Sequence, residues 1–142
     1  YDTACSSSIV AMHAAVRCIH THEVDTGLVV AANATLVPYI VPAIAGMTSP
    51  TGRCHTFDAS ADGYLRAEGA GALVLRHASA SSPANQGGAG VYALVRGARV
   101  AQDGVSASLT APNGRSQEKL LRAALRDAGP GHIASAVEPI IL

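Results

Sequence analysis

The chain has 142 residues, of which 49% are hydrophobic and 14% charged, and its formal net charge is zero. This length suits a single domain, and the low polarity argues against disorder. Balanced charge without a local run of Lys and Arg argues against nucleic-acid binding. No apolar run reaches the roughly 18 residues of a membrane span. Three cysteines, Cys5, Cys18 and Cys54, cannot form a fully paired disulfide framework, which predicts a reducing, cytoplasmic location.

In the first half of the chain the apolar pattern predicts a helix followed by two buried strands. Apolar residues recur at three- and four-residue steps over Ser6–His22, which is typical of a helix. Short apolar runs over Leu28–Ala32 and Ala70–Leu75 predict buried strands. Between them, Leu36–Gly52 contains three prolines and is expected to be a long structured excursion, and Phe57–Arg66 is expected to be a loop.

The second half begins with the segment richest in loop-forming residues, His77–Gly90, which predicts a surface loop. Val91–Val100 then predicts a third strand, and turn signals over Gln102–Gly114 predict another loop. A second helix is expected over Ser116–Ala128, capped by its first serine, and Ala136–Leu142 would begin a last strand. Helices and buried strands in this order predict an α/β fold.

A cysteine stands immediately before the first predicted helix, in the run Asp2-Thr3-Ala4-Cys5-Ser6-Ser7-Ser8. The first N–H groups of a helix are free and its macrodipole is positive there, which favours the thiolate form of Cys5. Such a thiolate can attack a thioester carbonyl while the Cys5 N–H points at the developing oxyanion. From this feature alone, a small buried hydrophobic cysteine is an open alternative.

Five further sequence motifs follow the Cys5 motif along the chain. They are Ser49-Pro50-Thr51-Gly52-Arg53-Cys54, Phe57-Asp58-Ala59-Ser60-Ala61-Asp62-Gly63-Tyr64, Arg66-Ala67-Glu68-Gly69-Ala70-Gly71, Gln102-Asp103-Gly104 and Leu109-Thr110-Ala111-Pro112-Asn113-Gly114. Together with the Cys5 run they resemble the motifs of β-ketoacyl synthase (ketosynthase) domains, in particular those of type I modular polyketide synthases. The resemblance extends from Asp2 to about Val137.

The resemblance implies a thiolase-like layered α/β fold of two similar halves. Residues 1–142 would be a central fragment, a partial ketosynthase domain that holds the end of the first half and the start of the second. The complete domain would be a homodimer. By analogy, Leu28–Ala32 would lie near the two-fold interface and Leu36–Met47 near the acyl pocket.

The resemblance also implies an activity, decarboxylative Claisen condensation in polyketide or fatty acid synthesis. Cys5 would hold the growing acyl chain as a thioester, delivered on the phosphopantetheine of an acyl carrier protein, and a malonyl-type thioester would extend it. The domain itself would bind no cofactor. The family's two catalytic histidine motifs have no counterpart in these 142 residues, so we expect the fragment alone to be inactive. The alternative is a non-catalytic remnant, a pseudo-ketosynthase without those histidines.

The cysteines, histidines and acidic residues of the chain also raise the hypothesis of a metal site. Two Cys/His pairs, Cys18 with His22 and Cys54 with His55, offer four ligands, but their spacing does not match a zinc module. The run that begins at Asp58 resembles the start of a calcium loop but lacks the acid at its twelfth position. We therefore expect no metal.

The acids Asp58, Asp62 and Glu68 are instead expected to be buried loop acids, which accept backbone N–H groups or pair with Arg66. The resident histidines are expected to have packing or surface roles. His13, about 12 Å along the helix from Cys5, is too far away to contact its sulfur.

Overall fold

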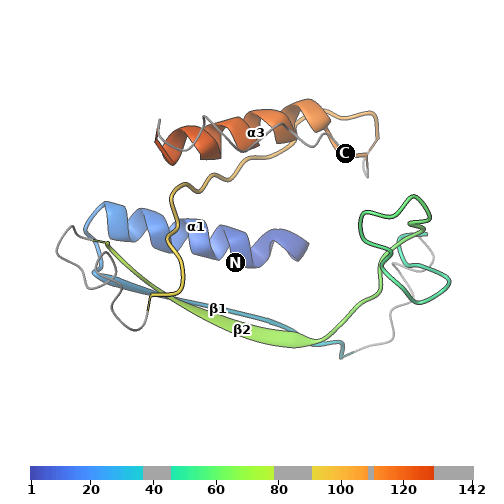
Figure 1. Cartoon of the computed structure of the whole chain (residues 1–142), viewed down its shortest axis with the longest axis horizontal. Coiled ribbons are helices and arrows are strands. Elements are labelled where there is room, and N and C mark those ends of the chain that lie inside the picture. The colour runs from blue at the N-terminus through green and yellow to red at the C-terminus, as the bar shows by residue number, and fades with distance from the viewer. Residues whose placement is uncertain (37–45, 79–90, 109–110, 130–142) are drawn as a thin grey trace. The chain divides into compact units, whose positions relative to one another are not determined.

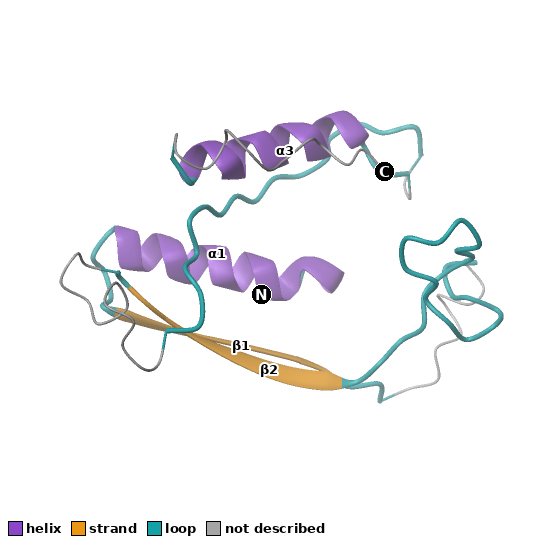
Figure 2. Ribbon diagram, viewed as in Figure 1, coloured by secondary structure: helices purple, strands orange, loops and turns teal. Residues whose placement is uncertain are grey.

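The computed structural model describes residues 1–36, 46–78, 91–108 and 111–129. The chain divides into two compact units, the first formed by Tyr1–Val29 and Val74–Leu142 and the second by Val30–Leu73. The elements in chain order are a 3₁₀ turn η1 (Ala4–Ser6), helix α1 (Ser7–His20), strands β1 (Thr26–Asn33) and β2 (Gly69–Arg76), and helix α3 (Gly114–Asp127) (Figure 1). This mixture of helix and strand confirms the predicted α/β class (Figure 2). In the described ranges no helix combines the length and apolar character that crossing a bilayer needs.

Helix α1 ends two residues earlier than predicted, in a Schellman motif. The N–H of Glu23 donates to the carbonyl of Cys18 at 3.0 Å, and the N–H of His22 donates to that of Ile19 at 3.2 Å. His22 occupies the left-handed position of this motif with φ 57°, where glycine is usual. Because no glycine stands at this position, the sequence did not indicate where the helix ends.

Strands β1 and β2 form a two-stranded sheet. The Asn33 side chain donates to the carbonyl of Ala67 at 2.6 Å, so the end of β1 lies beside the start of β2 and the strands run antiparallel. Val29 is buried, whereas its neighbours Leu28 and Val30 are 66% and 63% exposed. Both strands were predicted, but the expectation that they are buried was wrong, because a two-stranded ribbon covers few of its own side chains.

The prediction of a third strand over Val91–Val100 is wrong as well. In the described residues this segment pairs with no strand. Instead, Arg99 binds Asp127 of α3 through an ion pair of 2.6 Å, and this hydrogen-bonded pairing raises the pKa of Arg99 above its usual value. Valine-rich sequence favours an extended backbone, but a strand also needs a partner for its ladder.

Helix α3 begins with a cap that differs from the predicted one. The side chain of Asn113 accepts a hydrogen bond from the N–H of Ser116 at 3.2 Å. The amide nitrogen of Asn113 in turn donates to the carbonyls of Asp103 and Val105, at 3.2 and 3.0 Å. Asn113 is thus the N-cap, and the Ser116 hydroxyl donates to the carbonyl of Asp103 at 2.9 Å.

In the second unit, the predicted loop Phe57–Arg66 is confirmed, and it pairs with residues 47–49. Tyr64 and Thr48 form a parallel bridge, in which the N–H of Tyr64 donates to the carbonyl of Met47 at 3.1 Å. A side chain at Gly63, where φ is 143°, would overlap the backbone of Thr48 and Ser49. Gly63 therefore permits a close approach of two backbone segments.

Of the three acids expected to accept backbone N–H groups, Asp58 and Glu68 do so, but the expectation that all three are buried was wrong. Asp58 accepts from the N–H of Ser60 at 2.8 Å, and Glu68 accepts from the N–H of Thr35 at 2.6 Å. Asp58, Asp62 and Glu68 are all exposed. The parts of the predicted elements that fall within residues 37–45, 79–90 and 130–142 lie outside the described residues.

Candidate active site

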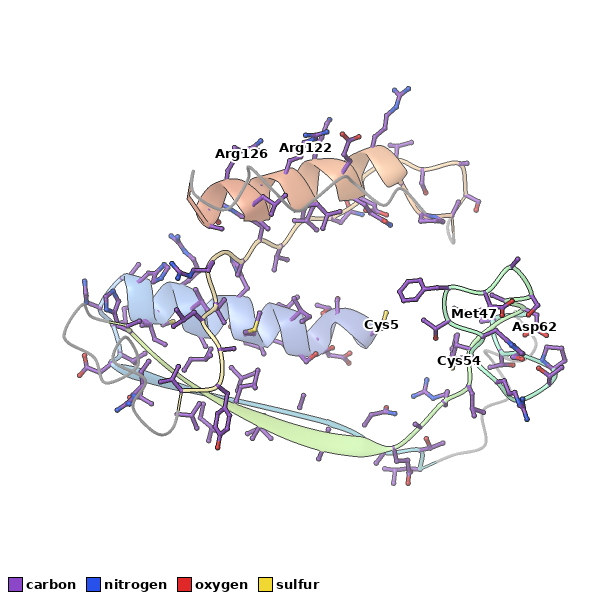
Figure 3. All side chains as sticks on the ribbon, in the orientation of Figure 1. Cys5, Met47, Cys54, Asp62, Arg122 and Arg126 are labelled. Atoms are coloured by element: carbon purple, nitrogen blue, oxygen red, sulfur yellow. The ribbon has the colours of Figure 1, made fainter. Side chains whose placement is uncertain are left out.

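Cys5 lies in the 3₁₀ turn η1, directly before α1. Its thiol is free and exposed, and its sulfur is seen at the N-terminal end of the helix (Figure 3). Among the described residues, the backbone N–H of Cys5 has no acceptor. One turn therefore presents both a nucleophilic sulfur and a hydrogen-bond donor to solvent.

The hydroxyl groups of two serines hold this turn together. Ser7 Oγ accepts from the N–H of Thr3 and donates to the carbonyl of Ala4, both at 2.8 Å. Ser6 Oγ donates toward the carbonyl and the hydroxyl of Thr3, both at 2.9 Å. These bonds fix the backbone on both sides of Cys5, so the side chain starts from a defined position.

Neither serine caps α1 through its side chain. The Ser6 side chain stands at the N-cap of α1 and makes no capping hydrogen bond, and the first turn contains no acidic residue. The positive end of the helix is therefore not neutralised by a carboxylate of its own first turn. An incoming oxyanion can use that field and the free N–H groups.

The residue before the nucleophile has an unusual backbone conformation. Ala4 has φ 56°, a left-handed value that costs an alanine about 1 kcal/mol or more. Sequence reasoning missed this feature, because no glycine or asparagine marks the position. This left-handed residue begins the turn η1, which leads into α1 and contains the exposed Cys5.

The other cysteines and histidines that sequence analysis considered as site residues do not lie in the turn that contains Cys5. Cys18 is half-buried on α1, and Cys54 accepts a hydrogen bond from the N–H of Leu65 at 3.0 Å in the second unit. His22 faces a residue that sequence analysis did not connect with it, His77, with 6.2 Å between ring centroids. Where residues are described, no three His, Cys, Asp or Glu side chains are grouped to hold a metal ion.

Known proteins match this chain over most of its length. Residues 1–81 match the family described as beta-ketoacyl synthase, N-terminal domain, and residues 92–135 match beta-ketoacyl synthase, C-terminal domain. A phenolphthiocerol/phthiocerol polyketide synthase protein of Mycobacterium tuberculosis is 49% identical over 128 residues, 87% of this chain and 6% of that protein. The highly reducing polyketide synthase fogA of Aspergillus ruber is 43% identical over 130 residues, 90% of this chain and 5% of that protein.

Solved structures give the same result. The ketosynthase from module 6 of the bacillaene synthase of Bacillus subtilis 168 is similar with a TM-score of 0.81 and 38% identity, over 91% of this chain and 23% of that one. An oxazolomycin ketosynthase domain of Streptomyces albus JA3453 gives 0.81 and 37%, with the same coverage. The chain thus spans a small part of each relative. It belongs to the beta-ketoacyl synthase family, with that family's thiolase-like α/β fold, and contains parts of both the N-terminal and the C-terminal domain.

Proposed function

We propose that this chain is the nucleophile-bearing part of a polyketide-synthase ketosynthase, in which Cys5 holds the growing acyl chain. One observation carries the proposal: in a chain of this family, the free, exposed thiol of Cys5 stands in the turn that begins a helix. The relatives that support a polyketide synthase are named as such, from a bacterium and a fungus.

In the first step the thiolate of Cys5 attacks the carbonyl carbon of an acyl thioester. The carbonyl oxygen becomes an oxyanion, which the free N–H of Cys5 and the positive end of α1 stabilise. The intermediate collapses as the carbon–sulfur bond to the carrier breaks, and the carrier sulfur leaves as a thiolate, which takes up a proton. The acyl group is then attached to Cys5 as a new thioester.

In the second step a malonyl-type thioester loses carbon dioxide and leaves a carbanion at its α-carbon. This carbon attacks the acyl carbonyl on Cys5, a carbon–carbon bond forms, and the bond from the carbonyl to the Cys5 sulfur breaks. The same N–H and helix end serve the second oxyanion. The product is a β-ketoacyl thioester on the carrier, and the thiolate of Cys5 is regenerated.

The acyl donor and the extender would arrive on the phosphopantetheine of an acyl carrier protein, and this domain would bind no cofactor of its own. We infer that the complete domain is a homodimer, and the exposed apolar side chains Leu28 and Val30 on β1 support a further contact of that strand. Three free cysteines support a reducing compartment, the cytoplasm.

A condensation assay on the full-length protein tests the proposal. Acyl and malonyl thioesters are supplied on the carrier, and the β-ketoacyl product is measured by mass spectrometry. Replacing the nucleophile, Cys5→Ala, should lower the product rate by at least about a thousandfold. The matched variant Cys18→Ala, on α1, should keep the rate. Equal rates for Cys5→Ala and the wild type would refute the proposed role.

A further inference from the structure

Asn113 and Gly114 form a reactive dipeptide that the proposed reaction does not use. The backbone nitrogen that follows an asparagine can attack the carbonyl carbon of the asparagine side chain, and glycine, which has no β-carbon, leaves that nitrogen unobstructed. Of the three asparagines, Asn33, Asn85 and Asn113, only Asn113 is followed by glycine. Asn113 is therefore the asparagine at which this spontaneous backbone reaction is easiest.

In the folded chain, hydrogen bonds hold both ends of the Asn113 side-chain amide. The amide oxygen accepts from the N–H of Ser116 at 3.2 Å, and the amide nitrogen donates to the carbonyls of Asp103 and Val105 at 3.2 and 3.0 Å. The backbone N–H of Asn113 also donates to the Asp103 carboxylate at 3.1 Å. The side chain is half-buried. These bonds prevent the amide from swinging toward the nitrogen of Gly114.

The backbone conformation of Asn113 also keeps the two reacting atoms apart. Its ψ of 94° places the nitrogen of Gly114 on the opposite side of the Cα–C bond from the Asn113 β-carbon. A five-membered ring through Cγ and that nitrogen needs the two on the same side. The start of α3 must therefore open before the ring can close.

Gly114 itself offers no further protection. It is exposed, and a β-carbon at this position would meet nothing within 4 Å in the described part of the chain. Water reaches the dipeptide, and no other group covers it there. The rate of the reaction in the folded protein is thus set by how often the hydrogen bonds of Asn113 open.

We propose that Asn113-Gly114 is a deamidation site, which the cap of α3 protects and which reacts when that cap opens. The backbone nitrogen of Gly114 forms a bond to Cγ of Asn113, and the bond from Cγ to the amide nitrogen breaks. Ammonia leaves, and it takes up through water the proton that the Gly114 nitrogen gives up. A water molecule then opens the cyclic imide at one of its two carbonyls, which leaves aspartate or isoaspartate in place of the asparagine.

Both products lack part of the native cap. Aspartate still accepts from the N–H of Ser116 and suits the positive end of the helix, but it cannot donate to the carbonyls of Asp103 and Val105. Its second oxygen would instead face those two carbonyl oxygens. Isoaspartate adds a carbon to the backbone and displaces the capping group altogether. Deamidation therefore loosens α3 from the segment that precedes it.

The test follows deamidation of the full-length protein at mildly alkaline pH, folded and unfolded in guanidinium chloride. Peptide mass spectrometry measures the mass gain on the peptide that contains Asn113. We expect reaction at least about tenfold faster in the unfolded chain, because the cap is lost there. Asn33, which is followed by alanine, is the internal control and should react at least about tenfold more slowly than Asn113 in the denaturant. Equal rates for Asn113 in both states, or no reaction in either, would overturn the proposal.

A variant of the cap tests whether these hydrogen bonds control the reaction. Ser116→Ala removes the hydroxyl that donates to the Asp103 carbonyl and keeps the N–H that Asn113 binds. Folded Ser116→Ala should deamidate about fivefold faster than the wild type, with an unchanged rate in the denaturant. The matched control Ser106→Ala removes a hydroxyl that donates to Ser108, and it should stay within about twofold of the wild type. Thermal melts establish that both variants fold. A wild-type rate in folded Ser116→Ala would contradict control by the cap.

The Gly114→Ala variant identifies the attacking atom. The added methyl group should slow deamidation of the unfolded chain at least about tenfold, because it obstructs the backbone nitrogen. A rate equal to that of the wild type would show direct hydrolysis of the side chain and would refute ring closure. None of these measurements involves Cys5, so failure of this inference and failure of the proposed function are separate outcomes.

Discussion

Gly97 and Ala124 lie so close together that a β-carbon on Gly97 would overlap the carbonyl oxygen of Ala124 and stand 3.0 Å from the N–H nitrogen of Ala128. No side chain separates the extended segment from α3 at this point. The contact is reinforced by the ion pair between Arg99 and Asp127. Together these contacts attach α3 to the segment that precedes it.

The Gly97→Ala variant should therefore lower the free energy of unfolding by about 1–3 kcal/mol, because the backbones must move apart to admit a methyl group. Chemical denaturation of the full-length protein measures the change. Gly114→Ala is the control, since a β-carbon there meets nothing within 4 Å and alanine favours the helix. If Gly97→Ala is as stable as the wild type, the close contact does not exist.

His22 at the end of α1 offers a stabilising change. Replacing it with glycine, His22→Gly, should raise the free energy of unfolding by about 1 kcal/mol, because φ 57° is strained for histidine and not for glycine. The same replacement at the last helical residue, His20→Gly, should lower it by a similar amount. Thermal melts of both variants check the pair, and a destabilised His22→Gly would contradict the Schellman assignment.

Ser7 is predicted to position the nucleophile. The Ser7→Ala variant loses two hydrogen bonds, to Thr3 and Ala4, so Cys5 should be acylated roughly tenfold more slowly while the protein stays folded. Ser7→Thr keeps the hydroxyl and should restore most of the rate. Rates are followed with an acyl-pantetheine donor, which excludes carrier docking. Should Ser7→Thr be as slow as Ser7→Ala, the hydroxyl is not the cause.

The loop of the second unit should respond to acid through Asp58. Hydrogen bonds from the N–H of Ser60, and then from its hydroxyl, hold the pKa of Asp58 below its usual value. A carboxylate with a lowered pKa in the folded state stabilises the fold above about pH 4, and this contribution is lost as the pH falls through the lowered value. Ser60→Ala should move the pKa of Asp58 upward in a carboxyl-detected NMR titration. An unchanged titration would show that the hydroxyl contributes nothing.

Local patterns in the sequence were enough to predict the helices and two of the strands. The periodicity of Ser6–His22 and Ser116–Ala128 indicated α1 and α3, and the runs around Val29 and Leu73 indicated β1 and β2. The same patterns failed for Val91–Val100, because strand pairing depends on a partner far away in the chain. These patterns also could not predict whether the side chains of β1 and β2 are buried, since burial depends on which elements cover the sheet.

The candidate site was predicted in part. The motif around Cys5 and the helix that follows it could be predicted from the sequence, because the residues that begin a helix are chemically distinctive. Sequence analysis could not predict the left-handed conformation of Ala4 or the use of Asn113 instead of Ser116 as a helix cap. Each depends on backbone geometry that several residue types can adopt.

The most direct measurement of the central claim is the site of acyl attachment. The full-length protein is incubated with an acyl-pantetheine thioester, digested without reducing agent, and the peptides containing Cys5, Cys18 and Cys54 are compared by mass spectrometry. The acyl mass should appear on Cys5, disappear in Cys5→Ala and be released when a malonyl thioester is added. An acyl group on Cys18 or Cys54, with Cys5 unmodified, would contradict the assignment of the nucleophile.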